Sequence, residues 1–271
     1  MGLFSRWFGG GNRPAPEPQT PEPESDDAVM ARALAAFTAK DYAQAIALWR
    51  PLAERGHPRA CNNLGGLYSY GYGVPRDPAE AARWIARAAE LGDPVGQTNL
   101  AFLHYEGNGV PQDHAQAIAW YRKAAAAGEG PAQDMLSHML FMGEGAAQDY
   151  AEARQWAERA AAAGVATAMT RLGNIHHDAL GAPRDPAAAA AWWQRAADLD
   201  EPEAQAMLGA AYHMGRGVAK DDVKALYWLL RAERASEEKA KGFIARVRAT
   251  LSPAQIAEAE FMAREGGMPE R

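Results

Sequence analysis

The sequence predicts an all-α protein, a right-handed α-solenoid built from helical hairpins. Alanine, which has the highest helix propensity, is the most frequent of the 271 residues, and β-branched residues are scarce. A leucine recurs every 36 residues, and a tryptophan follows each one twenty residues later. The leucines are Leu64, Leu100, Leu136, Leu172 and Leu208, and the tryptophans are Trp84, Trp120, Trp156, Trp192 and Trp228. A period of this length predicts stacked helical units, in place of one or two compact domains.

The first helix of each unit is predicted around the leucine. In the first copy, Ala60, Leu64 and Tyr68 fall on one face at i, i+4 and i+8. A small residue follows each leucine and allows close helix–helix approach: Gly65, Ala101, Ser137, Gly173 and Gly209. A Gly-x-Gly segment such as Gly71 to Gly73 then ends the helix, because glycine adopts positive φ at little cost.

The second helix of each unit is predicted to begin at an aspartate. These aspartates are Asp77, Asp113, Asp149, Asp185 and Asp221, and three of them precede a Glu or Gln by three residues, as in a capping box. The tryptophan stands seven residues after the aspartate, where we expect it to pack back on the first helix as core. Gly92 and its copies end the second helix.

The complete pattern closely resembles the Sel1-like repeat, a relative of the tetratricopeptide repeat. It reads Ala60-x-x-x-Leu64-Gly65-x-x-Tyr68-x-x-Gly71-x-Gly73-Val74-x-x-Asp77, then Ala81-x-x-Trp84. The resemblance covers five repeats over residues 60–235 and implies a non-catalytic protein-interaction or scaffold module. A β-lactamase-like subgroup of this family carries a cysteine pair in each repeat. Because Cys61 is the single cysteine, the sequence does not match that subgroup, and a hydrolase is only a remote alternative.

The two ends of the array are predicted to be caps. Residues 28–59 keep the phase of the repeat without its Gly-x-Gly loop, which indicates a shorter N-terminal capping hairpin. Residues 236–266 are predicted to form C-terminal capping helices, one of which begins at Ser252 and Pro253, and residues 267–271 form a tail.

The N-terminal 27 residues differ from the rest in composition. Residues 1–12 form a short apolar segment, and residues 13–27 form a proline-rich acidic linker that is expected to be disordered. One helical face of the first segment would carry four apolar side chains: Leu3, Phe4, Trp7 and Phe8. Such a face could dock on a partner or tether the protein to a membrane surface as an adaptor, or have no role. Arg6 interrupts the stretch where a secretory signal needs apolar residues, so we expect a cytoplasmic protein, with peripheral membrane association as the alternative.

Net charge argues against nucleic-acid binding. The chain carries −6, of which two arginines and five carboxylates in residues 1–27 account for −3. The repeats are therefore nearly neutral, without the basic surface that nucleic-acid binding requires. A protein or peptide partner is the expectation, and we expect no cofactor.

Side chains on the first helices that point away from the core predict a concave binding groove. They occur one residue before the leucine and two, five or six residues after it. The candidate partner-binding residues are Asn99, Phe102, Tyr105, Met135, His138, Phe141, Arg171, Asn174, His177 and His213. Aromatic and methionine anchors among polar groups suit an extended peptide or a partner helix. Alternatively, Phe102, Tyr105 and Phe141 pack between adjacent repeats.

Four histidines form the one plausible metal or catalytic cluster in the sequence: His138, His176, His177 and His213. Equivalent positions on neighbouring repeats lie about 10 Å apart, so a shared metal would need converging side chains and a carboxylate such as Asp178. We expect ordinary groove-lining histidines, no metal site and no catalytic residue.

Overall fold

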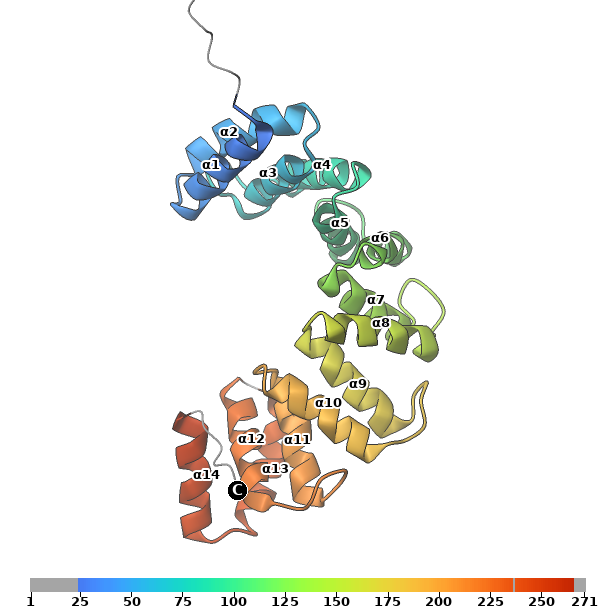
Figure 1. The fold of residues 1–271 in the computed structure, drawn as a ribbon, viewed down its shortest axis with the longest axis vertical. Coiled ribbons are helices and arrows are strands. Elements are labelled where there is room, and N and C mark those ends of the chain that lie inside the picture. The colour runs from blue at the N-terminus through green and yellow to red at the C-terminus, as the bar shows by residue number, and fades with distance from the viewer. Residues whose placement is uncertain (1–23, 236, 266–271) are drawn as a thin grey trace, which may run out of the picture.

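The computed structural model describes residues 24–235 and 237–265, which contain fourteen α-helices and no strand. The helices follow one another in an open, curved stack (Figure 1). They are α1 (Asp26–Thr38), α2 (Tyr42–Glu54), α3 (Pro58–Tyr70), α4 (Pro78–Glu90), α5 (Pro94–Glu106), α6 (His114–Ala126), α7 (Gly130–Met142), α8 (Tyr150–Ala162), α9 (Ala166–Asp178), α10 (Pro186–Ala197), α11 (Pro202–Met214), α12 (Asp222–Arg234), α13 (Glu238–Arg248) and α14 (Pro253–Glu265). None of the helices in residues 24–235 and 237–265 combines the length and the apolar character of a membrane-spanning segment.

Each repeat is a hairpin that packs on the next one. The repeat hairpins are α3–α4, α5–α6, α7–α8, α9–α10 and α11–α12. In addition, α3 contacts α5 and α7 contacts α9, whereas the second helices of these repeats pack mainly on their neighbours in the chain. The first helices therefore form the inner side of the curve.

The predicted helix boundaries are confirmed. In the first repeat, the Asp77 carboxylate accepts a hydrogen bond of 3.0 Å from the Glu80 backbone N–H. Gly71 ends α3 in the left-handed region at φ 74°. The Asp77 backbone N–H also donates to the Tyr68 carbonyl at 3.0 Å, a bond that recurs in every copy. Because this bond uses only backbone atoms, the side chain at the tyrosine position can vary between repeats.

The second glycine of the loop joins neighbouring repeats. A Cβ atom on Gly109 would lie 2.0 Å from the carbonyl oxygen of Pro78 in the preceding repeat, and one on Gly217 would lie 1.9 Å from that of Pro186. Only glycine permits this approach. The loop of one repeat can therefore rest on the start of the preceding second helix.

The predicted close approach after the leucine is also confirmed. A Cβ atom on Gly65 would come within 2.6 Å of Ile85, and one on Gly173 within 2.3 Å of the Trp193 indole nitrogen. The missing side chains therefore leave room for large residues on the second helices.

The leucines are buried as expected, and the tryptophans pack against the core to different depths. Trp228 is only 1% exposed, whereas the other four are half-buried at the edge of the core. A cation three residues later lies over each ring, at distances from 3.6 Å for Lys123 over Trp120 to 5.8 Å for Arg87 over Trp84. The remaining pairs are Trp156 with Arg159, Trp192 with Arg195 and Trp228 with Arg231. One ring face packs inward while a cation covers the other, so complete burial is unnecessary.

The ends differ slightly from the sequence prediction. Helix α1 begins at Asp26, inside the segment predicted as disordered linker, because Ser25 caps it and two aspartates occupy its first turn. At the other end, the Ser252 backbone N–H donates to Gln255 Oε1 at 3.0 Å, and α14 packs on α12. The predictions for Leu3, Phe4, Trp7 and Phe8 and for the tail lie outside the described residues.

Candidate protein-interaction face

An exposed row of side chains runs along the inner helices, six residues after each core leucine. We call these residues the inner row: Tyr70, Glu106, Met142, Asp178 and Met214. Tyr70 is 72% exposed, Met142 54% and Met214 42%. Apolar and acidic side chains therefore alternate from one repeat to the next.

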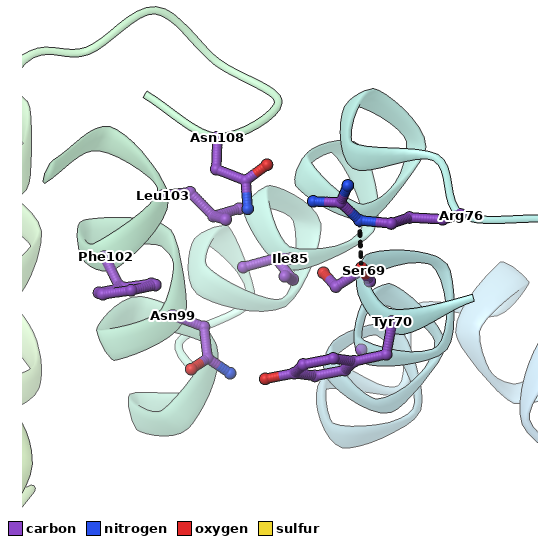
Figure 2. Close-up of a pocket in the computed structure, with 9 residues that line it drawn as sticks. Ser69, Tyr70, Arg76, Ile85, Asn99, Phe102, Leu103 and Asn108 are labelled. Atoms are coloured by element: carbon purple, nitrogen blue, oxygen red, sulfur yellow. Dashed lines mark hydrogen bonds between the residues drawn. The ribbon is translucent and has the colours of Figure 1, made fainter. Parts of the chain in front are cut away.

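A pocket of about 390 Å³ lies between α3 and α5, and we call it the Tyr70 pocket. Figure 2 shows Tyr70 and Phe102 on either side of Asn99. The Phe102 side chain is 48% exposed. On the rim, Arg76 Nε donates to the Ser69 carbonyl at 3.1 Å. The pocket is thus apolar at its sides, with amide groups and a single cation among the residues that line it.

A chain of aromatic rings supports Tyr70 from behind. Tyr70 stacks on Tyr72 with 5.6 Å between ring centroids, and Tyr72 stacks on Tyr42 at 5.0 Å. Phe37 contacts Tyr42 and Tyr72 at 5.7 and 6.2 Å. The exposed ring of Tyr70 is therefore held in place by the N-terminal hairpin.

A second pocket, of about 350 Å³, lies along α7, α9 and the start of α11, and we call it the Arg171 pocket. Arg171 Nη2 forms an ion pair of 3.0 Å with Asp134, and both side chains are at most 15% exposed. Thr167 donates to the other Asp134 oxygen at 2.6 Å. On the pocket's other side, Thr170 donates to Glu201 at 2.7 Å. These bonds connect the three first helices to one another.

His138 belongs to the same network. Its Nδ1 lies 3.0 Å from Arg171 Nη1, and because a guanidinium can only donate, Nδ1 is the acceptor. Burial, and then the charge of Arg171, lower the pKa of His138 below its ordinary value of 6.5. The imidazole is therefore neutral at neutral pH.

The three aromatic residues predicted in the groove do not all behave alike: one is exposed in the groove, and two are packed. Phe102 is exposed in the groove. Tyr105 is half-buried and stacks on His114 at 5.1 Å, and Phe141 is half-buried with its ring against Tyr150 at 5.1 Å. Phe141 also contacts two core clusters while lining the Arg171 pocket. Contacts with the second helix of the same repeat thus bury much of Tyr105 and Phe141, and Phe141 also packs between repeats.

The other predicted groove residues are placed as follows. Asn99 donates to Asn62 Oδ1 at 2.8 Å, and Met135 packs against a core cluster. Asn174 accepts from the Trp193 indole N–H at 3.1 Å while lining the Arg171 pocket.

The histidines do not converge. His177 pairs with Asp178 at 2.7 Å, and His213 pairs with Asp222 at 2.7 Å, away from the Arg171 pocket. In the part of the chain that the structure describes, no three His, Cys, Asp or Glu side chains are grouped to hold a metal. Cys61 is buried, where desolvation raises the pKa of its thiol.

The sequence prediction missed Tyr70 and the cations over the tryptophans. Tyr70 stands six residues after Leu64, at one of the positions predicted to point away from the core, but the candidate residues were all taken from later repeats. The cations follow each tryptophan by three residues, a periodic column that the sequence also contains. Glu201 lies seven residues before Leu208, in the column of N-cap residues that also contains His57 and Asp93, and the sequence analysis did not use that column.

The Sel1 repeat family model matches six segments that together cover most of the chain: residues 35–57, 58–93, 94–129, 130–165, 166–201 and 202–236. The chain belongs to the Sel1 repeat family. The first match lies within the segment predicted as the N-terminal capping hairpin, so this Sel1 repeat protein has one more match than the five repeats read from the sequence. Sel1 repeat proteins generally mediate protein–protein interaction.

Two solved structures are similar to this Sel1 repeat protein. A protective antigen of uropathogenic Escherichia coli with the same type of fold shares 29% identity at a TM-score of 0.79, over 89% of this chain and 54% of the antigen. The chain thus spans about half the length of that antigen. A Sel1 repeat protein from Oxalobacter formigenes shares 27% identity at a TM-score of 0.76, over 88% of this chain and 100% of the other. Among curated proteins, none matches the sequence.

Proposed function

We propose that the inner face binds an extended segment or a helix of a protein partner, as a non-catalytic scaffold module. The observation that carries this proposal is the exposure of Tyr70, Phe102, Met142 and Met214 on helices of one face. Large apolar side chains gathered on one concave surface are typical of partner sites, whereas scattered ones need no explanation. Aromatic and methionine side chains are also common anchors at interfaces.

The partner chemistry follows from the inner row. Glu106 and Asp178 separate its apolar members, so a partner that places basic side chains between apolar ones fits best. Charge pairs at the rim act mainly on association rates, and salt weakens them. We therefore expect association to slow at high ionic strength.

The polar groups of the Arg171 pocket support a structural role. Asp134 is bonded to Arg171 and Thr167, while His138 is bonded to Arg171. These bonds join helices of different repeats, which maintains the curvature that the inner face needs. We therefore propose no catalytic step for them.

Affinity capture from the source organism tests this proposal. The bait variant Tyr70→Ala/Phe102→Ala removes the two exposed rings of the Tyr70 pocket, and Phe261→Ala is the matched control. Phe261 is 62% exposed on α14, which packs on the second helix α12. A protein retained by the wild type and the control but lost by the double variant supports the proposal. Equal retention by all three baits, with unchanged melting temperatures, would contradict it.

A further inference from the structure

We propose that the chain's own N-terminal segment, residues 1–8, occupies the Tyr70 pocket and so competes with partners for the inner face. The competition rests on the proposed function, whereas the docking itself does not. Three observations carry the inference: the chemistry of the segment, the position where α1 begins, and the charges around the pocket.

The segment has the chemistry that the inner row requires. On a helix, Leu3, Phe4, Trp7 and Phe8 would share one face, and Arg6 is the one charged side chain among residues 1–8. Tyr70 and Phe102 offer an apolar pocket, and Glu106, at the end of the helix that carries Phe102, offers a carboxylate. Glu106 is exposed and forms no ion pair within the described residues. Arg6 can therefore pair with Glu106 while its neighbours enter the pocket.

The length of the linker permits this docking. Helix α1 begins beside the start of α3, because Asp26 pairs with Arg55 at 2.5 Å, just before α3. Tyr70 lies at the other end of α3, whose 13 residues span about 20 Å. Residues 9–25, extended at about 3.1 Å per residue, cover roughly 50 Å. The segment can therefore reach the pocket of its own chain.

Tethering compensates for the small size of the segment. A free helix of about eight residues is marginal in water and would bind weakly. A short linker holds it at an effective concentration in the millimolar range, where weak contacts suffice for high occupancy. Arg76 also lines the pocket, and its positive charge is complementary to the negative charge of the linker.

A spin label on the full-length protein tests the docking directly. Ser5→Cys receives a nitroxide, and Cys61 stays unlabelled because it is 0% exposed and donates to the Ala53 carbonyl. We expect loss of the backbone amide signals of Tyr70, Phe102 and Glu106, unchanged on dilution. Glu106→Lys should reduce this signal loss, and Asp178→Lys, the same exposed position two repeats away, should not.

Other occupants of the pocket give different results. The segment can instead dock on a second copy of the protein. In that case the signal loss fades on dilution, and it also appears when nitroxide-labelled protein is mixed with isotope-enriched protein that carries no nitroxide. This result would overturn the proposal. Retention of all amide signals, with flotation of the protein on anionic lipid vesicles that deletion of residues 1–12 abolishes, indicates a membrane tether and also overturns it.

Deletion of residues 1–12 separates this proposal from the proposed function. If the segment fills the pocket nine-tenths of the time, deletion should strengthen partner capture by about tenfold. Signal loss without any captured partner would preserve the docking and contradict the scaffold role. Partner capture without signal loss would support the scaffold role and contradict the docking of residues 1–8.

Discussion

The two pockets of the inner face occupy equivalent positions in different repeats, yet they are built differently. The residue before the core leucine is Asn99 in the Tyr70 pocket, where it contacts another amide, and Arg171 in the second pocket, where it forms a buried ion pair. Two residues after the leucine stand exposed Phe102 in one and half-buried Asn174 in the other. The same scaffold thus provides an open apolar surface near its N-terminus and an internally bonded polar one farther along.

Breaking the ion pair should have the largest effect on stability. Arg171→Met leaves Asp134, 12% exposed, without its cation, and should reduce the free energy of unfolding by about 3 kcal/mol, since Thr167 still donates to the carboxylate. Asn99→Ala, at the same position of the open pocket, should cost about 1 kcal/mol. Urea unfolding measures both. Equal losses would contradict the distinction between the pockets.

Phe141 and Phe102 should also differ in how much each contributes to stability. Phe141→Ala removes a ring that packs against two core clusters and should cost about 2 kcal/mol, less than a fully buried ring. Phe102→Ala, with its ring 48% exposed, should change stability by at most about 0.5 kcal/mol. Thermal melts of the single variants decide this. A large loss from Phe102→Ala would place that ring in the core.

Backbone strain at the end of the first helix is a further difference between repeats. Ala179 ends α9 at φ 61°, where the loops at α3 and α5 have Gly71 and Gly107. Ala179→Gly should therefore stabilise the protein by about 0.5–1 kcal/mol, because relief of strain exceeds the added chain entropy. Gly71→Ala should destabilise it. Destabilisation by Ala179→Gly would show that the left-handed alanine is not strained.

The smallest expected effect is a pH dependence of the free energy of unfolding, which arises from His138 in the Arg171 pocket. The lowered pKa of His138 means that the unfolded chain takes up a proton near pH 6.5 while the folded protein does not. Stability should therefore fall as pH decreases below about 6.5. His138→Gln should reduce this loss between pH 7.5 and 5.5, measured by urea unfolding. If the free energy of unfolding of His138→Gln falls with pH as steeply as that of the wild type, groups other than His138 cause the acid sensitivity.

The sequence predicted the fold well because each structural role recurs at a fixed position. Leu64 and its copies, the capping aspartates and the Gly-x-Gly loops each produce a column that can be read without a structure. The site was less predictable, since binding residues vary between repeats. Whether Phe141 points outward depends on Tyr150 in the next helix, and Arg171 finds Asp134 in a different repeat. Such contacts, within a repeat or between repeats, depend on how the helices pack in space, which the period does not encode.

Site-specific photo-cross-linking shows directly whether the inner face is the binding surface. Phe102→benzoylphenylalanine places the probe on the inner face, and Ala119→benzoylphenylalanine places it at an exposed position of the outer helix α6. After irradiation in the source organism, peptide mapping should show cross-links from position 102, to residues 1–8 or to a partner, and only background from position 119. Equal cross-linking from both positions, or cross-linking from position 119 alone, would contradict the account.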